Sequence, residues 1–219
     1  TQFTPNNTVV SLAVFGPDLY WGTIQGDVAK VSLDGTMYFM LGNANGAVFS
    51  LAATINGVYA TNGNRVSAFK PTGGLWWDSV GDPGVNSVAA NDLNVVWTST
   101  NSGRVRRAES NGNNQKLITS SEQGPTSIVL EGGIARWSNS NTGEIRESSV
   151  FGLDNAIAIF ATPPDARAGR VTVEGIATIR YLTTHHYFDC GKAARELGYK
   201  PTVDLTEGIK RTLATISRD

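Results

Sequence analysis

The chain is poor in the residues that most often carry metal-binding and nucleophilic chemistry. Its 219 residues include one cysteine, Cys190, and two histidines, His185 and His186. A single cysteine excludes an intramolecular disulfide framework and any zinc cage built from several thiolates. No G-x-S-x-G motif is present, and both histidines lie near the C-terminal end. Serine hydrolase chemistry is therefore not expected.

Charge and long apolar runs are also scarce. Only 17% of the residues are charged, and the formal net charge is -1. A nucleic-acid scaffold usually needs a basic stripe to offset phosphates, so no nucleic-acid partner is expected. No apolar run approaches the roughly 18 to 20 residues that span a bilayer, so no membrane span is expected. No secretory apolar segment opens the chain at Thr1, but such segments are removed on export, which leaves the compartment undetermined.

Composition changes sharply along the chain. All five tryptophans and 19 of the 24 glycines lie before residue 156. The prolines Pro163 and Pro164 follow, and paired prolines favour an extended linker. We therefore expect a repeat domain over residues 1–162, a linker over 163–179 and a tail over 180–219.

Internal repetition is the strongest pattern. A serine followed by small apolar residues recurs at spacings of 39, 37 and 40 residues. Three further short apolar runs follow each serine, separated by turns rich in Gly, Asn, Asp and Ser. The repeats begin at Ser11, Ser50, Ser87 and Ser127. Such runs are typical of antiparallel strands, so each repeat predicts one four-stranded sheet.

Four-stranded units that repeat every ~40 to 45 residues are the sequence signature of β-propeller blades. The segment DLYWGT at Asp18–Thr23 resembles a YWTD-type blade, and the whole array resembles YWTD and NHL-like propellers. We therefore expect an all-β propeller, or a partial array of four four-stranded blades, with a short α/β tail. The tryptophans at positions 21, 97 and 137 are expected to pack between blades.

The number of repeats predicts an incomplete ring. Four blades lie at the low end of the usual four to eight, and the YWTD resemblance implies six. Lys116 to Thr119 form the last run of the third repeat and precede the fourth serine. Gln2 to Thr4 precede the first serine in the same way, so we expect these three residues to belong to the last strand of an absent blade. An incomplete ring predicts closure by other blades or self-association.

The tail has a different character. Asp189 is placed to cap a helix that ends before Gly198, and a second helix is expected to begin at Asp204. The segment Thr184–Pro201 contains the pattern K-A-x-x-x-L-G-Y-x-P. With residues up to about 214, it resembles the C-terminal end of extended short-chain dehydrogenases of the 3β-hydroxysteroid dehydrogenase family.

That resemblance implies no catalytic residue here. Such enzymes need a Gly-rich turn for the dinucleotide pyrophosphate and a Tyr-x-x-x-Lys pair for proton transfer. Neither motif occurs in the chain. No cofactor-binding residue is assigned, and no cofactor is predicted.

One cluster contains metal-ligand residue types. It comprises His185, His186, Asp189 and Cys190. Adjacent histidines on a strand point to opposite faces, whereas zinc needs three or four convergent ligands. No metal site is predicted, and Asp189 is interpreted as a helix cap.

Polar turns between the second and third runs of each repeat are expected to lie on one rim, where loops can vary without disturbing the sheets. The predicted binding residues on this rim are Asn62, Asn64, Thr100, Asn101, Asn139 and Asn141. The basic cluster Arg104, Arg106 and Arg107 is interpreted as a solvated strand, with an anionic partner as the alternative.

Two functions remain open. The first is a non-enzymatic propeller scaffold whose polar rim binds a protein or a small ligand. The alternative is an oxidoreductase of the 3β-hydroxysteroid dehydrogenase type, represented only by its C-terminal segment. Saturable binding of NAD or NADP would distinguish the second from the first.

Overall fold

The computed structural model describes residues 8–152 and 156–160. The chain divides into two units, Thr1–Ile179 and Arg180–Asp219, and every described residue belongs to the first unit. The expected helices, the dehydrogenase-like segment and the whole linker over 163–179 lie outside the described residues. The α/β tail therefore stays a prediction.

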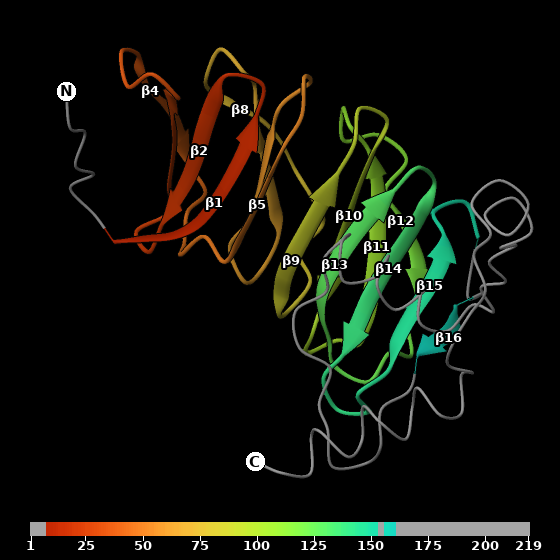
Figure 1. The fold of residues 1–219 in the computed structure, drawn as a ribbon. Helices are drawn as coiled ribbons and strands as arrows, with labels where there is room; N and C mark the ends of the chain where they lie inside the picture. The colour runs from red at the N-terminus through yellow and green to blue at the C-terminus, as the bar shows by residue number, and fades with distance from the viewer. Residues whose placement is uncertain (1–7, 153–155, 161–219) are drawn as a thin grey trace, which may run out of the picture. The chain divides into compact units, whose positions relative to one another are not determined.

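Within the described residues, sixteen strands form four separate antiparallel sheets (Figure 1). The first sheet contains β1 (Val9–Phe15), β2 (Asp18–Thr23), β3 (Asp27–Ser32) and β4 (Tyr38–Asn43). The second contains β5 (Ser50–Ala53), β6 (Val58–Thr61), β7 (Val66–Phe69) and β8 (Leu75–Asp78). The third contains β9 (Val85–Ala90), β10 (Asn94–Ser99), β11 (Arg104–Glu109) and β12 (Lys116–Thr119). The fourth contains β13 (Pro125–Glu131), β14 (Ile134–Asn139), β15 (Ile145–Ser149) and β16 (Ile157–Phe160).

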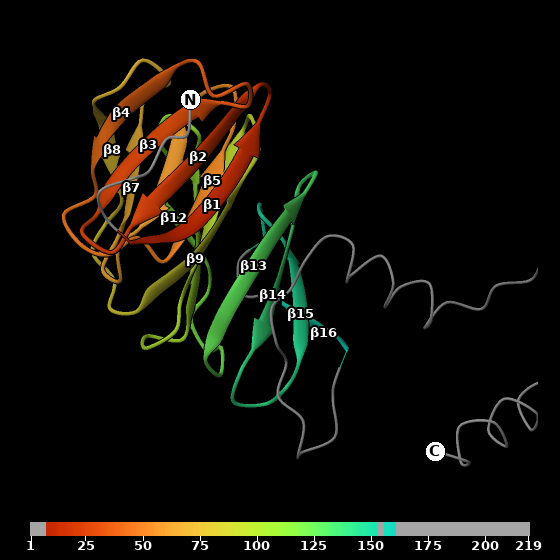
Figure 2. The ribbon, with the colours of Figure 1, turned by 60° about the vertical axis from the view of Figure 1, so that its left-hand side comes forward.

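Every sheet is a simple meander in which each strand pairs with the next along the chain. Figure 2 shows β1 to β4 side by side in one sheet and β13 to β16 in another. The registers repeat: Leu12 lies opposite Trp21 in the first sheet, and Ile128 lies opposite Trp137 in the fourth. The prediction of four all-β, four-stranded repeats is confirmed.

Successive sheets pack face to face. We call the face that packs on the following sheet the forward face, and the opposite one the backward face. Tyr59 on the forward face of the second sheet shares a core cluster with Trp97 on the backward face of the third. Val96 on the forward face of the third sheet shares the next cluster with Trp137. Each core therefore lies between two sheets, because one sheet cannot bury its own apolar face.

Two glycines of the first sheet leave room for side chains of the connection and of the second sheet. A Cβ at Gly42, whose φ is +157°, would lie 2.7 Å from Phe69 of β7. A Cβ at Gly22 of β2 would overlap the side chain of Val48. The bare backbone at these positions is what lets both side chains enter the core.

The three repeated tryptophans have different surroundings. Trp97 and Trp137 are buried between sheets, as expected. Trp21 lies on the backward face of the first sheet and stacks on Tyr38, with ring centroids 5.8 Å apart. Its expected place between two blades is not seen among the described residues, because no described sheet precedes the first.

The sheets do not close into a ring within the described part of the chain. Strand contacts join β1 to β5, β5 to β9 and β9 to β13, and no contact of this extent joins the first sheet to the fourth. Figure 1 accordingly shows the second and third sheets between the first and the fourth. The four repeats form an open array.

Candidate functional site

One rim of the array is built from two kinds of segment. The turns between the second and third strands of each sheet meet the connections that join consecutive sheets. Thr100 donates its backbone N–H to the carbonyl of Gly84, and Ser140 donates to that of Gly124. These paired segments define three junctions, one between each two consecutive sheets.

A buried aspartate holds the second junction. Asp82, in the connection from β8 to β9, is 1% exposed. It accepts hydrogen bonds from Arg106 Nε at 2.9 Å and from Arg104 Nη1 at 3.2 Å, both on β11. Burial disfavours its charged form, but the hydrogen bonds from Ser102 and Arg106 and the two nearby cations outweigh burial and hold the pKa of Asp82 below its ordinary value.

A buried glutamate holds the third junction in the same way. Glu122, in the connection from β12 to β13, accepts hydrogen bonds from Trp137 Nε1 at 2.9 Å and from Asn139 Nδ2 at 2.7 Å. Thr119 Oγ1 donates at 3.1 Å, and Arg146 Nε lies 3.3 Å away. Asp82 and Glu122 are 40 residues apart, as are Arg106 and Arg146. We call these two groups the acid clamps.

The first junction has a pocket where the other two have a clamp. The connection from β4 to β5 contains no acid between Ala44 and Phe49. A cavity of about 440 Å³ lies there. We call this cavity the rim pocket; its lining residues are Asn45, Phe49, Asn62, Gly63, Asn64 and Arg65.

The rim pocket is polar with one aromatic wall. The side-chain amide of Asn62, in the turn between β6 and β7, donates a hydrogen bond to the carbonyl of Ala44 in the connection that follows β4. Asn64 is exposed. Arg65 pairs with Asp78 at 3.3 Å, and both side chains remain partly exposed, so the guanidinium keeps donors for another acceptor. Phe49 is exposed beside Gly63.

The structure separates the six predicted rim residues into three groups. Asn62 and Asn64 line the rim pocket. Asn139 is buried against Glu122, and Thr100 Oγ1 donates to the carbonyl of Pro125 at 2.7 Å, so both join sheets. The remaining two, Asn101 and Asn141, are exposed on their turns away from the pocket. Their role in binding stays a prediction.

The basic cluster on β11 is not a solvated strand. Arg104 and Arg106 pair with Asp82, and Arg107 is 8% exposed, with its guanidinium 5.2 Å from the ring centroid of Phe151. The solvated interpretation is wrong because it considered the strand alone. The acid that neutralises two of these cations lies in a connection 22 and 24 residues earlier.

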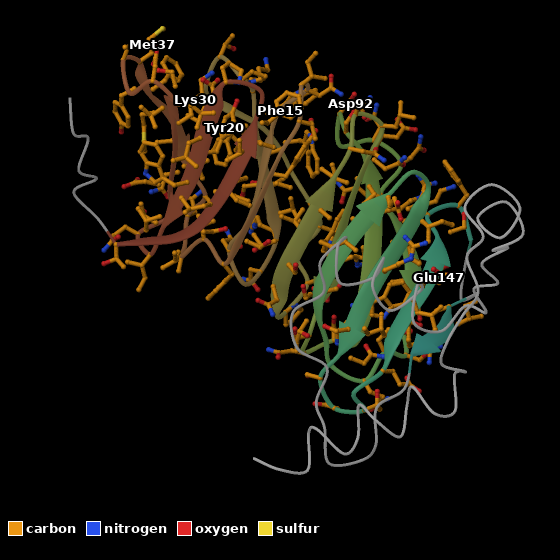
Figure 3. All side chains as sticks on the ribbon, viewed as in Figure 1. Phe15, Tyr20, Lys30, Met37, Asp92 and Glu147 are labelled. Carbon is orange, nitrogen blue, oxygen red and sulfur yellow. The ribbon has the colours of Figure 1, made fainter. Side chains whose placement is uncertain are left out.

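A second polar group lies on the first sheet, where Figure 3 labels Tyr20 and Lys30. Lys30 Nζ is 2.8 Å from Asp18 Oδ2, and the Tyr20 hydroxyl donates to the same oxygen at 3.3 Å. Burial, followed by the charge and hydrogen bond of Asp18, raises the pKa of Tyr20 to about 12. A phenol that ionises so reluctantly is suited to donating a hydrogen bond and unsuited to acting as a general base.

Metal-binding groups and membrane-spanning helices were sought in the part of the chain that the structure describes. Within residues 8–152 and 156–160, no three His, Cys, Asp or Glu side chains gather as metal ligands would. The same residues contain no helix with the length and apolarity needed to cross a bilayer. The cluster around His185 and Cys190 lies outside the described residues.

No protein-family model matches the chain, and no curated protein matches it. Solved structures resemble its fold. The computationally designed Ika4 protein aligns with a TM-score of 0.62 at 13% identity, over 68% of this chain and 96% of that chain. Virginiamycin B lyase from Staphylococcus aureus, a propeller, aligns with a TM-score of 0.61 at 16% identity, over 75% of this chain and 59% of the lyase.

A third solved structure has the same kind of likeness. The computationally designed Ika8 protein aligns with a TM-score of 0.52 at 15% identity, over 75% of this chain and 64% of that chain. Identities this low concern the fold alone. The described residues therefore form an all-β array of the β-propeller type, and the chain spans less than two thirds of the lyase and of Ika8.

Proposed function

We propose that this chain is a non-enzymatic binding scaffold, and that the rim pocket binds a short segment of a partner protein. The single observation that carries the proposal is the difference between the three junctions. Two are filled by a buried acid and its donors, whereas the first holds a cavity of about 440 Å³. Such a volume falls within the roughly 300 to 1,000 Å³ of typical ligand sites.

The chemistry of the lining supports a peptide ligand. Side-chain amides such as those of Asn45 and Asn64 can both donate to and accept from a peptide backbone. Arg65 offers a guanidinium for a carboxylate, and the exposed ring of Phe49 offers an apolar wall. A partner segment with a free carboxylate and one apolar side chain would use all three.

Fluorescence polarisation with a pool of fluorescein-labelled tetrapeptides that carry a free C-terminal carboxylate tests the proposal. We expect saturable binding to the full chain. The pool with amidated C-termini should bind more weakly, because a neutral end cannot pair with Arg65. The double variant N64A/R65A should weaken binding by at least about tenfold, which is the loss of about 1.4 kcal/mol.

The variant Asn113→Ala is the matched control, since Asn113 is an exposed asparagine in the turn between β11 and β12, outside the pocket. It should bind the pool as the wild type does. Binding that N64A/R65A leaves unchanged would rule out the rim pocket. A parallel titration with NAD and NADP, followed by tryptophan fluorescence, tests the oxidoreductase alternative, and saturable cofactor binding would contradict a scaffold-only function.

A further inference from the structure

The backward face of the first sheet is apolar and exposes large side chains on its two outer strands, while Trp21 and Ala29 of the central strands are 5% and 1% exposed. Leu12 and Val14 of β1 are 60% and 62% exposed, and Tyr38 and Met40 of β4 are 49% and 40% exposed. The registers place all four on one face with Trp21, because Leu12 lies opposite Trp21, Trp21 opposite Ala29, and Ala29 opposite Met40. Contiguous apolar surface of this kind marks an interaction site.

The repeat itself identifies what this face is built to contact. Leu12, Leu51, Val88 and Ile128 occupy the same position in the four repeats, one residue after the repeated serine. Their exposed fractions are 60%, 8%, 5% and 4%. The last three are buried by the forward face of the preceding sheet. Leu12 has the same chemistry and register, so the complementary surface is another forward face.

The forward face of the fourth sheet shares one repeat position with the other three but differs beside it, where Arg136, 2% exposed, stands in place of Tyr20, Tyr59 and Val96. Val129 stands where Ala13, Ala52 and Ala89 stand in the first three repeats, and each of those alanines packs on the core shared with the following sheet. Arg136 of the same face is neutralised by Glu131 at 2.9 Å and Glu147 at 2.8 Å. An arginine is already accommodated at an internal interface, since Arg107 lies on the forward face of the third sheet and is 8% exposed.

We propose that a second copy of this chain covers the backward face of the first sheet with the forward face of its own fourth sheet. The contact is head to tail and continues the interface that the chain forms three times internally. Two copies of the four described sheets, placed so that both such contacts form, give a closed ring of eight sheets. Eight is within the usual four to eight blades of a propeller, whereas three copies would give about twelve.

Size-exclusion chromatography with light scattering on the full chain tests the proposal. The wild type should have twice the 23.3 kDa mass of one chain. Leu12→Glu should raise the dimer Kd by about 100-fold or more, because it buries an unpaired carboxylate in the contact. Leu12 is well exposed within one copy, so circular dichroism and the melting temperature of the variant at low concentration should match those of the wild type.

Val129→Lys should dissociate the dimer as Leu12→Glu does, from the opposite face. Ile157→Lys provides a second variant of that face at an exposed position, in case Val129→Lys fails to fold. A mixture of the Leu12→Glu and Val129→Lys chains retains one intact contact and should regain the dimer mass. The variant N64A/R65A should stay dimeric, since the rim pocket is a separate site.

Three results would overturn the proposal. A wild type that is monomeric at high micromolar concentration would mean that another segment or partner covers the face. A dimer that survives Leu12→Glu would place the contact elsewhere. A dimer that Leu12→Glu breaks but Val129→Lys and Ile157→Lys leave intact would mean that two first sheets pack on each other, without the fourth sheet.

Discussion

The first junction of the array joins two consecutive sheets by different contacts from those at the second and third junctions. At the second and third junctions, a buried acid in the connection binds donors of the following sheet. At the first junction, two glycines admit Val48 and Phe69 deep between the sheets, and a cavity remains at the rim. Close packing against a glycine is not confined to the first junction, since a Cβ at Gly112 of the third sheet would lie 2.6 Å from Trp77 of the second. What distinguishes the first junction is that its connection contributes no buried acid and that a cavity lies at its rim.

The acid clamps make the stability of the second and third junctions sensitive to the loss of a single side chain, and the first junction lacks this sensitivity. A buried carboxylate contributes stability only while every donor around it stays in place, since losing one partner leaves the other desolvated and unpaired. The connection at the first junction contains no buried carboxylate, so replacing its side chains leaves no buried charge without a partner. Exposed lining residues of the rim pocket, such as Asn64, can therefore be replaced at little cost in stability.

The largest expected effect comes from removing the third clamp. Glu122→Ala strands the buried donors of Trp137, Asn139 and Thr119, and we expect it to lower the free energy of unfolding by about 3 to 5 kcal/mol. Urea denaturation followed by tryptophan fluorescence measures the change. The control is Glu131→Ala, whose carboxylate is exposed, and a loss of similar size in the control would contradict the clamp.

Asp82→Asn should cost somewhat less, about 2 to 3 kcal/mol at neutral pH, because the two arginines that lose their partner are partly exposed. The loss should depend on pH. The pKa of Asp82 in the folded state lies below the unfolded value of about 3.9. The stabilisation is therefore complete above about pH 5 and falls as the pH drops through the folded-state pKa.

Denaturation of the wild type and Asp82→Asn between pH 3 and pH 7 measures this dependence. The two stability curves should converge as the pH falls. If the difference in free energy of unfolding stayed constant from pH 3 to pH 7, the contribution of Asp82 would come from its packing and not from its charge.

Gly22→Ala tests the packing at the first junction and should cost about 1 to 3 kcal/mol, the usual range for overpacking a core. The new methyl group would overlap Val48. The double variant G22A/V48A removes Val48 Cγ1, the atom nearest the new methyl group, and keeps only Val48 Cβ in close contact, so its loss should be smaller than the sum of the two single losses. Additive losses would mean that Gly22 is required for another reason.

The smallest effect concerns the unequal lengths of the two clamp acids. Trp137 Nε1 donates to Glu122, whereas Trp97 Nε1, at the same repeat position, is buried without a hydrogen-bond partner among the described residues. Asp82 is one methylene shorter than Glu122, and its oxygens are held by arginines. Asp82→Glu should reach Trp97 and stabilise the fold by about 1 kcal/mol, with a changed near-ultraviolet dichroism signal from Trp97. A destabilised variant with an unchanged signal would contradict this account.

Much of the sheet architecture could be predicted from the sequence, because strand period and turn residues are local signals. The four repeated serines predict the first strand of each sheet, and each of them lies within that strand: Ser11 in β1, Ser50 in β5, Ser87 in β9 and Ser127 in β13.

Strand period and turn residues do not predict the acid clamps. Asp82 and Glu122 lie in connections outside the strand pattern and differ in residue type. The available signal was their spacing, which equals that between Arg106 and Arg146 and that between Trp97 and Trp137. The rim pocket was half predicted: Asn62 and Asn64 were named from their turn, whereas Asn45 and Phe49 belong to a connection that only the packing of two sheets brings beside it.

Native-state hydrogen exchange tests the contrast between the junctions most directly. The backbone N–H groups of Ala44, Asp82 and Glu122 each donate across a rim turn, to Gly26, Asn64 and Gly103 respectively, so each reports the opening of one connection. The acid clamps predict that the Asp82 and Glu122 amides exchange with higher opening free energies than the Ala44 amide. Equal protection at all three amides, or the greatest protection at Ala44, would contradict the account.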